Sequence, residues 1–218
     1  MAICFAITDI DWELTKDVFG IIGTLVSAAG VCVAGWIGFE GLKTWRRQSK
    51  GASDHDLSRR ILLDLYSLRD CVSALRSPVM LVSESAIPPE QLEGLSFLQR
   101  SYRHNAYSYQ QRFVPLDEVR NRLRGEILES EVVWSENLKS LYDPIMTLIH
   151  ELWMNVRAHL VTINPDETDD MVKSYRDILA SRRDVLYELP LEGEDEFKKD
   201  LVEALTKLED YLKPKLIS

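Results

Sequence analysis

Residues 18–39 read VFGIIGTLVSAAGVCVAGWIGF and decide the fold of this chain. These 22 residues carry no charged side chain. At the α-helical rise of about 1.5 Å per residue they span roughly 33 Å, which is enough to cross the hydrocarbon core of a bilayer. The buried helix of a soluble protein rarely stays uncharged over such a length. The stretch therefore predicts a transmembrane helix over residues 18–40.

The flanking charges predict the orientation of this helix. Lys16 is the only basic residue before it, whereas four follow it: Lys43, Arg46, Arg47 and Lys50. Basic residues are retained on the cytoplasmic side of membranes. We therefore expect residues 1–17 to form a short extracytoplasmic tail, residues 41–52 a basic juxtamembrane connector, and residues 53–218 a cytoplasmic domain. Trp36 and Trp45 are predicted to lie at the membrane interface beside the four basic residues. Because the leading residues are acidic and the apolar run is long, we expect the segment to be retained rather than cleaved as a secretory signal.

Small residues gather on one face of the predicted span. With about 100° between successive residues of a helix, six of them fall within an arc of roughly 80°. They are Gly23, Ser27, Gly30, Ala34, Gly38 and Gly41. Small side chains let two helix backbones approach closely in lipid, so the pattern favours association with a second copy or with another membrane protein. The alternative is that glycine is simply common in membrane helices.

Beyond the connector, the chain has the length and composition of one folded domain. About 170 residues remain after the tail and span are removed, and the whole chain is 45% hydrophobic and 28% charged. The net charge of −9 is unevenly distributed, with a balance of +4 in residues 100–125 and −10 from residue 126 onward. The overall acidity argues against a dedicated nucleic-acid binder.

Apolar periodicity predicts only helices in residues 53–218. We expect the membrane helix to end near Gly51 and a new helix to start with Ser53 and Asp54 as caps. The new helix has one apolar stripe: Leu57, Ile61, Leu65, Leu68, Val72 and Leu75. The last predicted helix, from Glu194 to about Leu212, has another: Phe197, Leu201, Ala204, Leu205, Leu208 and Leu212. Stripes of this width face partner helices.

The middle of the domain is also helical in pattern. Pro115 is expected to interrupt one helix, and Pro144 to kink or split a nearly continuous pattern over residues 116–163. A further helix is expected from Thr168 to about Leu189, with residues that include Met171 and Ile178 facing inward. The sequence thus predicts an all-α fold, in which one N-terminal transmembrane helix precedes a cytoplasmic antiparallel bundle of four to five helices.

One segment, residues 100–124, alternates arginine with tyrosine. Its candidate surface residues are Arg100, Arg103, Tyr107, Tyr109, Arg112, Arg120 and Arg124. Arginine and tyrosine are enriched at protein interfaces, and the same mixture can bind phosphates and stack on bases. The alternative is that the aromatics pack inward while the arginines pair with the acidic C-terminal helices. The sequence leaves open a structural role, a protein partner, and an anionic or nucleic-acid ligand.

The chain shows no pattern of catalytic chemistry. Its histidines, His55, His104, His150 and His159, lack the spacing of a metal site, and no Walker loop, GxSxG elbow or GxGxxG motif is present. We therefore expect no enzyme activity, no cofactor and no metal.

The sequence GLKTWRRQSKG over residues 41–51, followed by RRILLDLYSLRDCVSALRSP over residues 59–78, resembles uncharacterised bacterial single-pass membrane proteins with a cytoplasmic helical domain. The resemblance covers about a sixth of the chain. It implies a bacterial inner membrane, but it implies no activity and carries over no functional residue.

These observations predict a membrane-anchored, non-enzymatic module for interaction, scaffolding or regulation. Such a module assembles through the small-residue face and an Arg/Tyr-rich surface. One alternative is a membrane effector that oligomerises and perturbs the bilayer on a cytoplasmic signal. Another is a sensor of an anionic ligand or nucleic acid.

Overall fold

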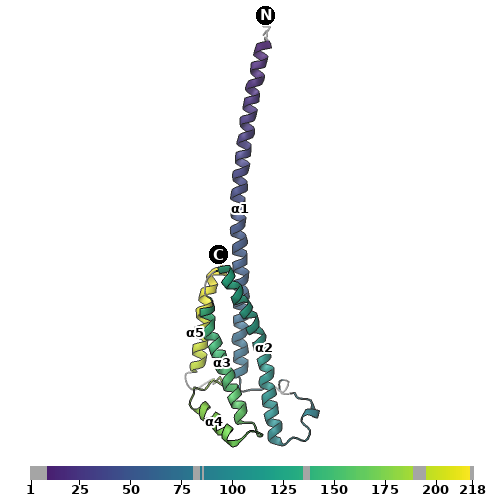
Figure 1. Ribbon diagram of the computed structural model, residues 1–218, viewed down its shortest axis with the longest axis vertical. Helices are drawn as coiled ribbons and strands as arrows, with labels where there is room; N and C mark the ends of the chain where they lie inside the picture. Colours follow the sequence, from purple (N-terminus) through teal and green to yellow (C-terminus); the bar gives the residue numbers. More distant parts are fainter. Residues whose placement is uncertain (1–8, 81–83, 85, 135–137, 189–194, 217–218) are drawn as a thin grey trace. The chain divides into compact units, whose positions relative to one another are not determined.

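The computed structural model describes residues 9–80, 84, 86–134, 138–188 and 195–216, and in these residues all regular structure is helical (Figure 1). The described α-helices are α1 (Asp9–Arg76), α2 (Phe97–Trp134), α3 (Lys139–Thr162), α4 (Asp169–Ala180) and α5 (Glu196–Leu212). Two short 3₁₀ helices cover Pro89–Gln91 and Lys213–Leu216. The all-α prediction is confirmed. The chain divides into two compact units, Met1–Ala52 and Ser53–Ser218.

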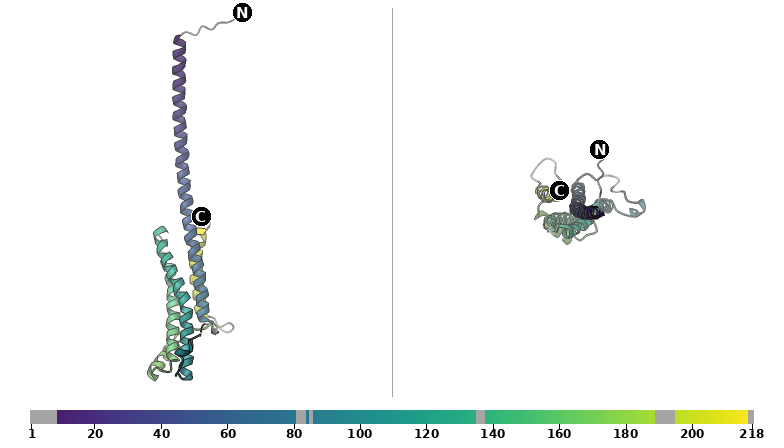
Figure 2. Two further views of the ribbon diagram at one scale, coloured as in Figure 1. Left: turned by 90° about the vertical axis from the view of Figure 1, so that its right-hand side faces the viewer. Right: turned by 90° about the horizontal axis from the view of Figure 1, so that it is seen from above.

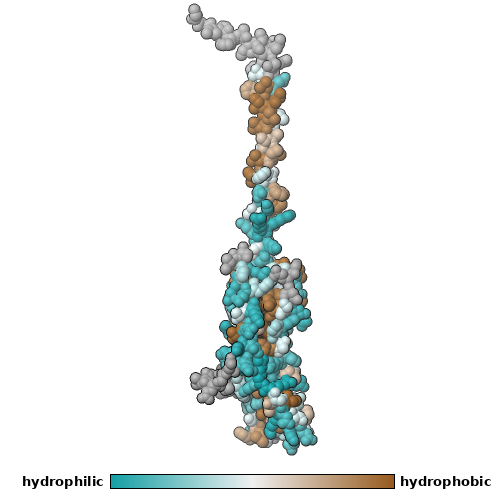
Figure 3. Space-filling view, turned by 90° about the vertical axis from the view of Figure 1, so that its left-hand side faces the viewer, coloured by the Kyte–Doolittle hydropathy of each residue, from teal (hydrophilic) through white to brown (hydrophobic). Residues whose placement is uncertain are grey.

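The described part of the first unit is helix, and its apolar side chains are exposed. Leu25, Trp36 and Ile37 expose 64%, 73% and 65% of their surface. Figure 3 shows a mostly brown, hydrophobic band on the protruding helix, followed by a teal, hydrophilic stretch. Among the described residues, α1 is the one helix whose length and composition allow it to cross a membrane, with a mean hydropathy of 2.1 in its most apolar window.

The second unit is built around the two predicted apolar stripes. Every residue of the stripe from Leu57 to Leu75 is at most 1% exposed, and the stripe from Phe197 to Leu212 is buried throughout. Figure 2 shows this part of α1 next to α5, and α2 next to α3. Side chains of α2 and α3, such as Leu123 and Leu152, complete one shared core. Burying large apolar side chains stabilises a fold by about 1.5–3 kcal/mol each, so the stripes dominate the stability of this unit.

The helix boundaries predicted at Gly51, at Ser53 and at Pro115 are wrong. Residue Gly51 does not end a helix, since α1 continues through it and through Ser53 and Asp54. A glycine that ends a helix usually adopts a positive φ, and among the described glycines only Gly94 does so. A glycine inside a helix costs only about 1 kcal/mol, and the helical residues on both sides outweigh that cost.

The two prolines also lie inside helices rather than ending them. Pro115 lies within α2 and Pro144 within α3. Both are exposed, so water can reach the backbone carbonyl that each leaves without a helical partner. Leu116 and Ile145, the residues that directly follow them, are fully buried, and their packing offsets the roughly 3 kcal/mol cost of an interior proline.

The boundary between two described helices lies elsewhere, because α2 ends at Trp134 and α3 begins at Lys139. The nearly continuous helical pattern predicted over residues 116–163 missed this break. The fourth helix is shorter than predicted, ending at Ala180, and the predicted inward residues Met171 and Ile178 are 44% and 41% exposed. The predicted break at Pro190 and Gly193 lies outside the described residues.

Arg76 joins the end of the α1 stripe to the segment that leads into α5. Its side chain is buried and donates to the carbonyls of Val185 (2.8 Å) and Tyr187 (3.0 Å), and it pairs with Asp195 at 2.9 Å. Asp195 in turn accepts from the backbone N–H of Lys198 and so caps α5. A buried cation with all these partners fixes how the segment before α5 returns to α1.

We predict that Arg76→Gln lowers the free energy of unfolding by about 3–5 kcal/mol, because Asp195 and two carbonyls lose a charged donor. Urea unfolding of the full chain in detergent micelles, followed by circular dichroism, measures this change. The control is Arg69→Gln, which removes an exposed arginine paired with its neighbour Asp70 on the same helix. It should cost less than about 1 kcal/mol. Equal losses in the two variants would contradict the role given to Arg76.

Candidate functional site

The small-residue face of α1 has no neighbour within the described chain. A Cβ atom added at Gly23, Gly30, Gly38 or Gly41 would meet nothing within 4 Å. The hydroxyl of Ser27 donates back to the carbonyl of Gly23 at 2.8 Å. Packing inside the described chain therefore does not explain why these positions are small.

The residues expected at the membrane interface are exposed on the same helix. Trp36 and Trp45 are 73% and 63% exposed, and all four basic residues of the connector are exposed too. None of these four makes an ion pair with another described residue. Both features suit a helix whose surroundings are lipid and headgroups.

The Arg/Tyr segment does not form one surface, because α2 turns its members in different directions. Tyr109 and Arg112 are only 2% and 6% exposed. Arg112 pairs with Glu84 at 2.8 Å and donates to the carbonyl of Ser77 at 2.9 Å. These two residues follow the same helical period as the buried Leu116, so they belong to the interior. Their prediction as partner-surface residues is wrong.

The remaining members separate into two groups. Arg100 is exposed and donates to the carbonyl of Leu95 at 3.0 Å. Arg103 and Tyr107 line a shallow cavity of about 410 Å³ beside Asp166. Arg120 and Arg124 lie about four to six turns further along α2 and line a different groove. In the described ion pairs, Arg112 pairs with Glu84, Arg120 with Asp117 of the same helix and Arg122 with Asp64 of α1, and none of the segment's arginines pairs with the acidic C-terminal helices.

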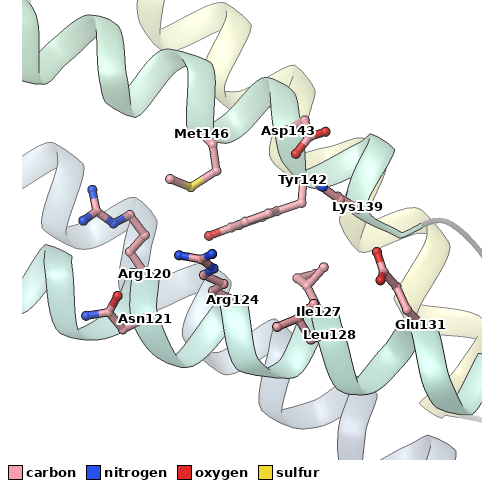
Figure 4. Close-up of a pocket in the computed structure, with 10 residues that line it drawn as sticks. All are labelled: Arg120, Asn121, Arg124, Ile127, Leu128, Glu131, Lys139, Tyr142, Asp143 and Met146. Atoms are coloured by element: carbon pink, nitrogen blue, oxygen red, sulfur yellow. The ribbon is translucent and has the colours of Figure 1, made fainter.

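A groove of about 450 Å³ separates part of α2 from α3 (Figure 4). Helix α2 contributes Arg120 and Arg124, which are four residues apart and so share one face of the helix. The main contributions of α3 are Lys139, Tyr142 and Met146. A volume of this size is in the range of small-molecule sites.

The hydroxyl of Tyr142 is buried in this groove without a partner. The residue is 6% exposed, and its oxygen makes no hydrogen bond to any described residue. In Figure 4 the hydroxyl points toward Arg120 and Arg124. Burial raises the pKa of Tyr142 to about 12, against the opposite effect of the two arginine charges, so the hydroxyl stays protonated and can donate.

Both arginines are accessible to a ligand in the groove. Arg124 is exposed and forms no ion pair with a described residue. Arg120 pairs with Asp117 at 3.0 Å, but both side chains are more than a third exposed. An exposed pair of this kind contributes at most about 1 kcal/mol, so a ligand can replace Asp117 at little cost.

The sequence pattern predicted Arg120 and Arg124 as candidate site residues, but it did not predict Tyr142. The signal was present, because Tyr142 follows the apolar period of Leu138, Ile145 and Ile149, which places a polar hydroxyl in the core. Predicting that this hydroxyl lies near the two arginines would have required knowing that one helix ends at Trp134 and the next begins at Lys139.

No family model, curated protein or solved structure matches the chain. Its function is therefore inferred from its residues and their contacts alone. In the described residues, no three His, Cys, Asp or Glu side chains lie together in a way that could hold a metal ion.

A buried carboxyl lies on the opposite face of α2, where it meets α1. Glu126 is 8% exposed, lies 3.8 Å from the Arg60 guanidinium, and has one oxygen without a described partner. Burial, together with the nearby carboxylates of Asp64 and Glu129, raises the pKa of Glu126 to about 7 against the opposite effect of Arg60 and Arg122. The folded protein therefore holds this proton more tightly than the unfolded chain does.

We predict that the free energy of unfolding falls as pH rises from about 4.5 to about 7, since Glu126 must lose a proton that only the folded state retains. Glu126→Gln should remove this fall and be about 1–2 kcal/mol more stable than wild type at pH 8. Urea unfolding at pH 5 and pH 8 measures the difference, with exposed Glu118→Gln as the control. A variant with the same pH dependence as wild type would contradict this assignment.

Proposed function

We propose that this protein is a single-pass membrane-anchored interaction module that assembles through the small-residue face of α1. The observation that carries the proposal is the exposed apolar surface of residues 18–39. Eleven large apolar side chains are exposed there. At about 1.5–3 kcal/mol each, their transfer out of water is worth more than the 5–15 kcal/mol that stabilises a typical domain.

Lipid accounts for most of this surface, and a second helix accounts for the glycines. Six small residues on one seam, with open space beside each glycine among them, permit close contact with another helix. The partner in this proposal is a second copy of the chain or another membrane protein. In this proposal the N-terminus lies outside and residues 53–218 lie in the cytoplasm, an orientation that the basic connector supports. The membrane proposed is a bacterial inner membrane, on the resemblance of residues 41–78.

The second unit, in this proposal, is an antiparallel bundle that presents exposed side chains to a cytoplasmic partner. Its support is the shared core of α1, α2, α3 and α5, and ion pairs that join neighbouring helices, such as Arg122 with Asp64 at 2.9 Å. Two members of the Arg/Tyr segment border one cavity of this unit, the exposed Arg103 and the half-buried Tyr107.

A pore-forming effector has less support. Thr24 and Ser27 are the only hydroxyl side chains between residues 18 and 39. Both donate to carbonyls one turn earlier in their own helix, at 2.9 and 2.8 Å. The span therefore offers no free polar side chain along which an aqueous pore could be lined.

We predict that Gly30→Leu with Gly38→Leu weakens helix association about tenfold, because two bulky side chains separate the backbones at the seam. Chemical cross-linking in native membranes, with a blot for the tagged chain, detects partners of either kind. The matched control is Gly35→Leu, the same substitution about 100° from the centre of the seam. Equal cross-linking of all three proteins would contradict assembly through this face.

We predict that the basic connector sets the orientation. Replacing its four basic residues by glutamine and Asp9 and Asp11 by lysine should move the C-terminus outside in a large fraction of molecules. A C-terminal alkaline phosphatase, which is active only outside the cytoplasm, reports this change. The control keeps the charge, with Lys43→Arg and Lys50→Arg. Phosphatase activity already present in the wild-type fusion would contradict the proposed topology.

A further inference from the structure

We propose that the groove between α2 and α3 binds a phosphate monoester that carries an apolar group, through Arg120, Arg124 and the Tyr142 hydroxyl. This proposal is independent of how α1 assembles, since every residue it uses lies in the second unit. It rests on three observations, which are a pair of available guanidinium groups, a buried donor without an acceptor, and a cavity of ligand size.

The guanidinium pair supplies the charge. Arg120 and Arg124 lie one helical turn apart on the same face, a separation of about 6 Å, so both can reach one tetrahedral anion. Arginine binds phosphate oxygens in a bidentate manner and is the preferred residue for that contact. A monoester has three terminal oxygens and about two charges, which suits two guanidinium groups and a hydroxyl better than a carboxylate does.

The Tyr142 hydroxyl supplies the strongest indication of a missing ligand. A buried hydroxyl without an acceptor destabilises a fold by about 1–3 kcal/mol, and such groups are rare unless they have a use. Its ring packs among core residues, so the hydroxyl is held where Figure 4 shows it, pointing toward the two arginines. An anionic oxygen placed between these three groups would accept from all of them.

The rest of the groove explains the apolar part of the ligand. Ile127, Leu128 and Met146 line it next to the arginines. The lining also includes Lys139 and the acidic residues Glu131 and Asp143, and in Figure 4 Glu131 and Lys139 lie away from the two arginines. Asp143 directly follows Tyr142, and its charge raises the pKa of the Tyr142 hydroxyl against the effect of the arginines. Glu131 is seven residues from Arg124, which is about 10 Å along a helix, so it does not compete with the anion.

Two sources can supply this chemistry, a soluble phosphate ester or the headgroup of phosphatidic acid. The experiment uses the full chain in nanodiscs of phosphatidylcholine and measures binding by calorimetry. Phenyl phosphate is the soluble probe, with phenol and benzoate as its neutral and carboxylate counterparts. Nanodiscs that contain phosphatidic acid are the lipid probe, and a rise in the Tm of the second unit reports binding of that lipid.

We predict that wild type binds phenyl phosphate or responds to phosphatidic acid, and that Arg124→Gln weakens the response about tenfold or more. Tyr142→Phe should also weaken it, yet without ligand its Tm should equal that of wild type or exceed it by about 2–4 °C. A purely structural tyrosine would not combine these two effects. The control is Arg59→Gln, an exposed arginine on α1 outside the groove.

Binding of phenyl phosphate by wild type identifies a soluble ester as the source, and a response to phosphatidic acid alone identifies the lipid. Three results would overturn the proposal. The first is that neither probe binds, and the second is that benzoate binds more tightly than phenyl phosphate. The third is that Arg124→Gln and Tyr142→Phe bind as wild type does.

Discussion

The apolar surface of residues 18–39 is the constraint on which the rest of this structure depends. Eleven large apolar side chains are exposed there, and no described residue covers them. In a bilayer that surface is in its preferred solvent, and an α-helix is the one single-segment structure that satisfies all of its backbone hydrogen bonds internally. A membrane anchor thus accounts for both the composition and the conformation of this segment, whereas exposure to water accounts for neither.

Within the second unit, one apolar stripe organises the remaining helices. The six stripe residues Leu57, Ile61, Leu65, Leu68, Val72 and Leu75 are buried in a core shared with α2, α3 and α5, and Arg76 at the end of the stripe binds the carbonyl of Val185 in the segment before α5. Not every polar group in this unit is satisfied to the same extent. The buried groups of Arg76 and Arg112 have several partners each, whereas Glu126 and Tyr142 each retain an unpartnered oxygen. The Tyr142 hydroxyl lacks a hydrogen-bond partner and lies beside two available arginines, and this combination is what we take as the mark of a binding site.

The sequence predicted the helical class, the apolar span and both stripes, because hydrophobic periodicity is a local signal that a single helix already carries. It failed where a long-range contact decides the outcome. Pro115 was expected to interrupt a helix and Pro144 to kink or split one, but both lie inside helices that continue past them, next to the buried Leu116 and Ile145. Tyr109 and Arg112 were expected on a surface, but their position on α2 turns them inward. The groove lies between two helices, α2 ending at Trp134 and α3 beginning at Lys139, and the sequence marks this boundary with neither a glycine nor a proline.

The molar mass of the full chain tests the central claim most directly. Light scattering on protein purified in mild detergent from the cells that naturally produce it, with the co-purifying chains identified, gives both size and composition. Assembly through α1 predicts a defined multiple of the 25.1 kDa chain or a stoichiometric complex with a second membrane protein. A monomer without a companion chain would contradict the account, and the glycine face would then be only an ordinary feature of a membrane helix.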